Sequence, residues 1–190
     1  MRYRAYFAPL ENALGVVSFC ITLEGGKIVD VKDMEIGLDA GFFGRREGEN
    51  IEELIEEYRR RREWKKLEVV YHEYYHVLTL ERMLKGKYVW EVDRRLVEGS
   101  AYLYGKLRKY ADMTGNEELA YYLAVKELER ERNFGKERGY WKFVSVYVEP
   151  ALKIARTLKP KIAIEMLENV VPEYGSLEEL GYYSSLEHAS

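Results

Sequence analysis

The stretch VVSFCITLEGGKIVDVKDM, residues 16–34, sets the fold class expected for this 190-residue chain. Its two runs, Val16–Leu23 and Lys27–Met34, are rich in β-branched residues, which favour strands. The Gly25–Gly26 pair between them supplies positive φ values at low cost, as a tight type I′ turn requires. The pattern predicts a β-hairpin, and Arg2–Phe7 predicts a further strand before it.

From Asn50 onward the sequence predicts helices, which polar caps, glycines and prolines divide into segments. Asn50 with Glu53 resembles an N-cap and its reciprocal partner, and Thr114 with Glu117 forms a second pair of this kind. Pro150 is expected to kink or split the helix that contains it. The predicted helices cover about residues 50–62, 66–84, 90–110, 114–132, 140–158, 160–170 and 176–186.

The two parts of the pattern together predict a single α+β domain over residues 1–190. A small N-terminal hairpin or sheet is expected over about residues 1–45, followed by a mostly helical body over about residues 50–190. Gly41–Gly48, which is rich in glycine and charge, is expected to be a loop between them.

Charge and hydropathy narrow the classes of partner. The formal net charge of −3 and a pI near 5.8 give no reason to expect nucleic-acid binding. The basic run Arg59–Arg62 is interpreted as a solvated helix face rather than a phosphate-binding patch. No apolar run of about 18 residues and no basic-then-apolar leader occurs, so we expect no membrane association and a cytoplasmic protein. The abundance of Glu, Lys and Arg, without any Gln, suits a heat-adapted source.

The segment His72-Glu73-Tyr74-Tyr75-His76 carries the chemistry that the sequence predicts. His72 and His76 are four residues apart on a predicted helix, so both imidazoles lie on one face and can reach one ion. Glu73 stands beside them, where a carboxylate can take a proton from a water held by the metal. Two His ligands and one carboxylate leave an open position for that water, as a catalytic zinc site requires.

The neighbours of this segment strengthen the interpretation. Val69–Tyr71, Tyr74–Tyr75 and Val77–Leu78 carry no charge, and a helix that is apolar nearly all round is expected to be buried. Two histidines on a buried helix need partners, because unsatisfied polar groups are costly there. A single metal ion would satisfy both imidazoles at once.

Val69–Leu78, VVYHEYYHVL, resembles the extended signature of the zincin metallopeptidases, in which uncharged residues flank an HExxH core. Leu96–Ala101, LVEGSA, is similar to the Glu-Gly-x-Ala segment of the gluzincin branch, and its glutamate follows the motif at close to the usual separation of that branch. The chain is also similar in size to the minimal gluzincins of archaea. By this resemblance the Zn²⁺ ligands are His72, His76 and Glu98, and Glu73 is the general base.

The resemblance implies a zinc-dependent metallopeptidase that hydrolyses peptide bonds of a peptide or protein substrate. Zincins usually carry an edge strand shortly before the active helix, whereas the strands predicted in this chain lie further upstream. The N-terminal hairpin is therefore the segment expected to line the cleft and to hold an extended peptide by β-augmentation. Apart from His188, no histidine remains as an oxyanion donor, and 17 tyrosines offer no single candidate.

Other functions fit the same residues. The histidine pair could be two core imidazoles satisfied by carboxylates such as Glu98. Glu73-x-x-His76 is also an ExxH motif, but a ferritin-like di-iron site needs a second copy, which this sequence lacks. The leading alternative is a non-peptidase metal-binding or helical interaction protein that retains the zincin-like site, because a motif does not guarantee turnover.

Other residues compete for the roles assigned above. Glu91 or Asp93 could replace Glu98 as the third ligand, whereas Glu81 lies more than a turn beyond the motif on the same helix. His188 is interpreted as a surface residue near the end of the chain, with self-inhibition through the zinc as its alternative. Cys20, the one cysteine, excludes an internal disulfide and a site of several thiolates, and is expected to be a small buried side chain.

Overall fold

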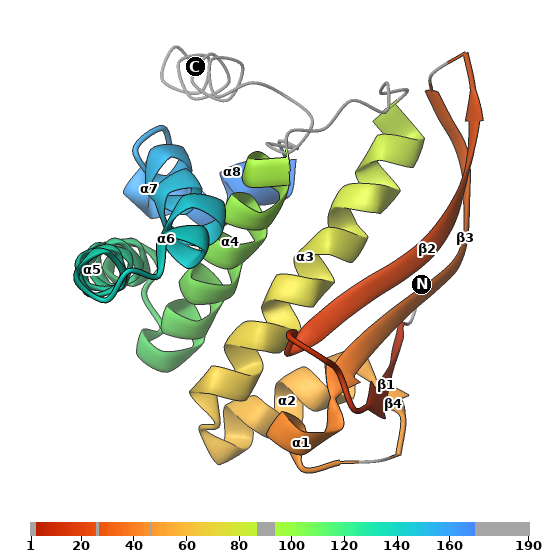
Figure 1. Cartoon of the computed structure of the whole chain (residues 1–190), viewed down its shortest axis with the longest axis horizontal. Helices are drawn as coiled ribbons and strands as arrows, with labels where there is room; N and C mark the ends of the chain where they lie inside the picture. Colours follow the sequence, from red (N-terminus) through yellow and green to blue (C-terminus); the bar gives the residue numbers. More distant parts are fainter. Residues whose placement is uncertain (1–2, 26, 46, 87–93, 170–190) are drawn as a thin grey trace. The chain divides into compact units, whose positions relative to one another are not determined.

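The computed structural model describes residues 3–25, 27–45, 47–86 and 94–169 (Figure 1). A small N-terminal sheet followed by mostly helical chain confirms the α+β class. Contacts group the chain into two compact units, Met1–Trp90 and Glu91–Ser190, and the single domain stays a prediction. The predicted helix at 176–186, the predicted helix start at 90–93 and His188 lie outside the described residues.

A mixed sheet of four strands, in the order β2-β3-β1-β4, forms the base of the first unit. β2 and β3 form the predicted antiparallel hairpin, and Gly25 has a φ of 56° in the turn between them. β1 runs parallel to β3 and antiparallel to β4, which leaves β2 as an edge strand of this sheet. The strands are β1 (Arg4–Ala8), β2 (Gly15–Glu24), β3 (Lys27–Asp39) and β4 (Glu49–Asn50).

A short helix, α1 (Ala40–Phe43), follows β3 at a point where the sequence predicted a loop. Asp39 caps this helix, because its carboxylate accepts hydrogen bonds from the backbone N–H groups of Leu10 and Phe42, at 2.9 and 2.8 Å. These two bonds hold the pKa of Asp39 below its usual range. The loop prediction was wrong here because a helix of four residues is too short to leave an apolar periodicity in the sequence.

Two helices complete the first unit, α2 (Ile51–Arg61) and α3 (Trp64–Gly86). α2 begins at its predicted N-cap, where the Asn50 side chain accepts from the N–H of Glu52 at 2.9 Å. α3 packs against β2, β3 and α2, and Figure 1 shows it running beside the long hairpin. The sheet, α2 and α3 all contribute buried apolar side chains to the core: Ile36, Leu38, Leu54, Tyr58, Leu67, Val70 and Tyr75.

The described part of the second unit is helical. Its longest helices are α4 (Arg94–Thr114) and α5 (Glu117–Glu137), and α4 packs against α5, α7 and α8. α4 buries Ala101, Leu103, Tyr104 and Leu107, and the Tyr104 hydroxyl donates a hydrogen bond to Glu168 of α8 at 2.8 Å. The shorter elements are α6 (Trp141–Phe143), the π-helix η1 (Val144–Val148), α7 (Glu149–Ala155), the 3₁₀-helix η2 (Pro160–Ile162) and α8 (Ala163–Asn169).

Two predicted boundaries of this unit can be compared with the structure. Pro150 does not split its helix: the backbone stays helical, and it changes from the π-helix η1 to α7 directly before Glu149, with Pro150 as the second residue of α7. The cap of α5 differs, because Asn116 and not Thr114 accepts from a helix N–H, that of Leu119 at 3.0 Å. Thr114 is instead the last residue of α4, and Gly115, at a φ of 68°, ends α4 before α5 begins.

Hydropathy along the helices bears on the membrane prediction. Among the described residues, no helix combines the length and the apolar character that crossing a membrane requires.

Candidate metal centre

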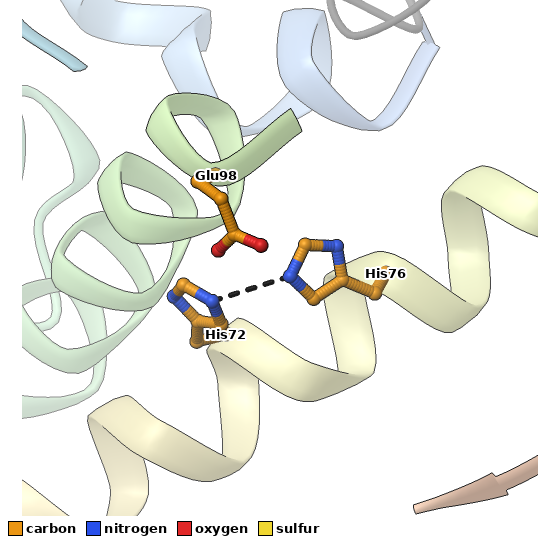
Figure 2. Close-up of side chains that lie close together, drawn as sticks. All are labelled: His72, His76 and Glu98. Atoms are coloured by element: carbon orange, nitrogen blue, oxygen red, sulfur yellow. Dashed lines mark hydrogen bonds between the residues drawn. The ribbon is translucent and has the colours of Figure 1, made fainter. Parts of the chain in front are cut away.

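The predicted histidine pair lies on α3, one turn apart and on one face of the helix (Figure 2). The Nε2 atoms of His72 and His76 are 3.2 Å apart. Their ring centroids are 5.0 Å apart, and the ring planes are inclined by 73°. Both rings are half-buried. The spacing of four residues on a helix therefore brings the two imidazoles together, as the sequence predicted.

The distance between the two nitrogens fits a zinc ion. Tetrahedral zinc holds nitrogen ligands at about 2.0–2.1 Å, which places two of them about 3.3 Å from each other. The observed Nε2–Nε2 distance of 3.2 Å is close to this value. In the absence of an ion, one ring would donate a hydrogen bond to the other, whereas both rings would turn a lone pair towards an ion. The donor set and its spacing therefore suit two ligands of one metal.

Glu73 is a buried carboxylate next to His72 in the sequence, with 6% of its surface exposed. It lies on the side of α3 that meets the sheet, against Gly15, the first residue of β2. A Cβ atom at Gly15 would lie 2.5 Å from Cγ and 2.7 Å from Oε1 of Glu73. Sequence reasoning missed Gly15, because no local pattern links a strand start to a helix residue so far along the chain.

Glu98, the predicted third ligand, belongs to α4 in the second unit and is half-buried there. Figure 2 labels it together with the two histidines. Two of the three predicted ligands therefore belong to the first unit, and the third belongs to the second unit. Glu91 and Asp93, the alternative ligands, lie outside the described residues, as does His188.

The small residues that follow Glu98 have a packing role within the second unit. A Cβ atom at Gly99 would lie 2.5 Å from the Cβ of Pro150 and 3.0 Å from the backbone nitrogen of Ala151. Ala101 is fully buried. Gly99 therefore allows α4 to approach α7 closely, which gives the Glu-Gly-x-Ala segment a structural reason of its own.

Glu81, the least favoured alternative ligand, contacts a residue near β1. Its carboxylate accepts a hydrogen bond from the hydroxyl of Tyr3, which is 8% exposed. Burial raises the pKa of Tyr3, and the bond to the Glu81 carboxylate raises it further. This contact ties the C-terminal part of α3 to the start of the sheet.

Two further predictions concern residues outside the centre. Cys20 is exposed, so the prediction of a buried thiol was wrong. It lies on the edge strand β2, where Ser18, Cys20 and Thr22 alternate outward with half-buried neighbours. In the basic run, Arg60, Arg61 and Arg62 are exposed, as a solvated helix face requires.

Comparison with known proteins gives no match for this chain among family models, curated proteins or solved structures.

Proposed function

We propose that the chain is a zinc-dependent metallopeptidase of the gluzincin type, acting in the cytoplasm on a peptide or protein substrate. The observation that carries the proposal is the pair of imidazole nitrogens, 3.2 Å apart on one face of α3, with the buried carboxylate of Glu73 in the same turn. In this proposal His72, His76 and Glu98 bind the ion. The spacing of the two nitrogens on α3 supports His72 and His76, and Glu98 is included because its segment is similar to that of the gluzincins.

The proposed chemistry assigns one role to each group. Zinc, when bound, lowers the pKa of a coordinated water towards about 7 and polarises the carbonyl under attack. The imidazoles of His72 and His76 and the carboxylate of Glu98 hold the ion and leave a position open for substrate and water. Glu73 accepts the proton of the attacking water and passes it to the nitrogen that leaves.

The edge strand β2 supports a peptide as the substrate class. It begins at Gly15 beside Glu73 and, within the described part of the sheet, pairs with β3 on one side. An extended peptide could add to such an edge through backbone hydrogen bonds, which would bring its scissile bond past the general base. β2 thus takes the place of the edge strand that zincins carry, although it lies well upstream of the motif in the sequence.

Metal content is the first test. Elemental analysis of the purified, zinc-reconstituted protein should find about one zinc per chain, and His72→Ala/His76→Ala should bind none, because both nitrogen ligands are lost. His188→Ala is the matched control, since it removes the third histidine of the chain and should keep the metal. A wild-type protein that binds no zinc would refute the catalytic proposal.

The third ligand needs its own variant. Glu98→Gln removes the charge but keeps the shape of the side chain, and it should weaken zinc binding by about tenfold or more in a chelator competition. Glu117→Gln, at an exposed position in the first turn of α5, is the control. Equal zinc affinity in the two variants would remove Glu98 from the site.

A peptide-cleavage assay distinguishes a peptidase from a protein that only binds the metal. Quenched peptides should be cleaved by the wild type, and a chelator should stop the reaction. Glu73→Gln should retain zinc and lose roughly 100- to 10,000-fold in rate, the range attributed to general acid–base catalysis. Glu56→Gln, at a side chain 72% exposed on α2, should cleave normally. A Glu73→Gln protein that cleaves at the original rate would contradict the assigned role.

A second candidate is a metal-binding protein without peptidase activity. The observation that favours it is the packing of Gly99 against Pro150, which accounts for the glycine after Glu98 without any catalytic role. This candidate predicts bound zinc, loss of the metal in the double histidine variant and no cleavage across the peptide panel.

A further inference from the structure

We infer that Gly15 is the positioning residue for Glu73: the absence of a side chain at the start of β2 fixes where the Glu73 carboxylate lies. As a statement about catalysis, this inference rests on the proposed role of that carboxylate as the general base. Gly15 belongs to no motif in the sequence, and only its contact with Glu73 of α3 links it to the candidate site.

The contact is specific to one side chain. The three atoms nearest to a Cβ at Gly15 all belong to Glu73: Cγ at 2.5 Å, Oε1 at 2.7 Å and Cδ at 2.8 Å. Real Cβ atoms essentially never approach heavy atoms within 3.0 Å, so an alanine at this position forces a displacement. Glu73 is 6% exposed, so its side chain fills a defined space rather than moving in solvent.

The start of β2 is held in place from the other side. Gly15 pairs with Leu38 of β3, a fully buried residue. The residue before it, Leu14, accepts a backbone hydrogen bond from Asp39 at 2.9 Å. The Asp39 carboxylate in turn accepts from Leu10, within the segment that leads into β2. Because these bonds hold the strand, we expect an alanine at Gly15 to displace the Glu73 side chain.

The identity of the displaced side chain distinguishes the proposed base from the proposed metal ligands. His72 and His76 are not among the three nearest neighbours of the Gly15 position. Gly15→Ala should therefore leave the zinc ligands in place while moving the carboxylate that takes the proton. A misplacement of a catalytic group by about 1 Å can cost on the order of 100-fold in rate.

A double-mutant cycle tests the contact without any need for activity. Thermal unfolding midpoints are measured for wild type, Gly15→Ala, Glu73→Ala and the double variant, all in the metal-free form. Gly15→Ala should lower the midpoint in the wild-type background and lower it clearly less when Glu73 is already alanine, because the obstructing atoms are gone.

Gly37→Ala is the matched control for the cycle. It places the same substitution in the same sheet, but its Cβ would meet the Tyr6 hydroxyl at 2.7 Å. Its effect on the midpoint should be the same with and without Glu73→Ala. An additive result for Gly15→Ala, equal to that of the control, would overturn the inference.

Kinetics test what the contact does for the reaction. With the zinc-loaded protein, Gly15→Ala should retain the wild-type zinc content and lower kcat by about tenfold or more, with a smaller change in KM, because the proton transfer is affected rather than the binding of the peptide. An unchanged kcat in Gly15→Ala, alongside an active wild type, would overturn the inference while leaving the peptidase standing. A wild type without hydrolysis would refute the proposed function, and the stability cycle would then decide on Gly15 by itself.

Discussion

α3 and α4 have similar lengths, 23 and 21 residues, yet they bury charge in different ways. α4 buries Lys106 and Lys109, which are 1% and 5% exposed. Each ammonium group meets a carboxylate of α5 at 2.9 Å, Lys106 at Glu131 and Lys109 at Glu127. α3 instead buries a carboxylate, Glu73, in the same turn as a histidine pair and against the glycine that opens β2.

The difference lies in what surrounds each charge. On α4 the ammonium of Lys106 also lies 4.4 Å from the centre of the Tyr102 ring, whose hydroxyl donates to Glu131. Opposite charges, a ring face and a hydroxyl together form a network that fixes the packing of α4 on α5. On α3 the buried carboxylate lies in the same turn as two imidazole nitrogens, which are 3.2 Å apart, a spacing that suits a metal. A buried charge therefore marks a candidate site through the chemistry of its neighbours rather than through burial itself.

The largest effect in this comparison is expected from Lys106→Met. The substitution keeps the length of the side chain but leaves Glu127 and Glu131 without one cation. We expect a loss of about 2 kcal/mol in the free energy of unfolding, less than a fully buried pair would lose, because the two glutamates are 27% and 25% exposed. Urea unfolding measures it, and zinc content should not change.

Lys126→Met, at an exposed position on α5, is the control for Lys106→Met and should change the free energy of unfolding by less than about 0.5 kcal/mol. If folded Lys106→Met protein lost its zinc, the charge network of α4 would not be independent of the candidate metal site on α3.

A smaller effect is expected from Gly99→Ala, which tests whether the residue after Glu98 serves packing. Alanine normally stabilises a helix interior relative to glycine by up to about 1 kcal/mol. At Gly99 we expect the opposite, a loss of about 1–2 kcal/mol, because the new Cβ would lie 2.5 Å from Pro150. Gly41→Ala, whose Cβ would meet only an Asp39 oxygen at 3.3 Å, is the control. A Gly99→Ala protein as stable as wild type would show that α4 and α7 do not depend on this approach.

The smallest effect concerns pH and the network of α4. Burial by itself would raise the pKa of Glu127, but the ammonium groups of Lys106 and Lys109 outweigh it and hold this pKa below its usual value of 4.5. A carboxyl group whose folded pKa is depressed stabilises the fold fully above its unfolded pKa and loses that contribution as the pH falls through the folded value. Stability should therefore fall as the pH drops below about 4.5.

The matched pair Glu127→Gln and Glu129→Gln isolates this contribution. Unfolding free energies measured between pH 7 and pH 3 should fall less steeply with acid in Glu127→Gln than in wild type, whereas Glu129→Gln, at an exposed position, should follow the wild type. Identical slopes in all three proteins would mean that the lysines of α4 do not depress the pKa of Glu127.

Local chemistry explains which parts of the fold the sequence predicted. The hairpin is defined by β-branched runs around two glycines, and the start of α2 by Asn50, and each of these signals acts within a few residues. The histidine pair was predictable for the same reason, because a spacing of four residues is a property of one helix.

Features that depend on the fold were not predictable in the same way. The exposure of Cys20 follows from the place of β2 at the edge of the sheet, and β-branched neighbours carry no information about strand order. The contact between Gly15 and Glu73 joins a strand to a helix, so no window of sequence contains both residues. Glu98 was selected through a family resemblance, which includes its separation from the histidine motif, and not through the geometry of one helix. The Glu98→Gln variant is therefore needed to test the third ligand.

The close contact at the start of β2 also restricts how this sequence can change. A larger residue at position 15 should cost least stability where position 73 has already shortened, and a glutamate at position 73 should cost least where position 15 is glycine. If position 15 enlarges while position 73 is still glutamate, the chain should pass through a less stable intermediate. In a lineage of such chains, the two positions should therefore vary together, with the glutamate lost before the glycine.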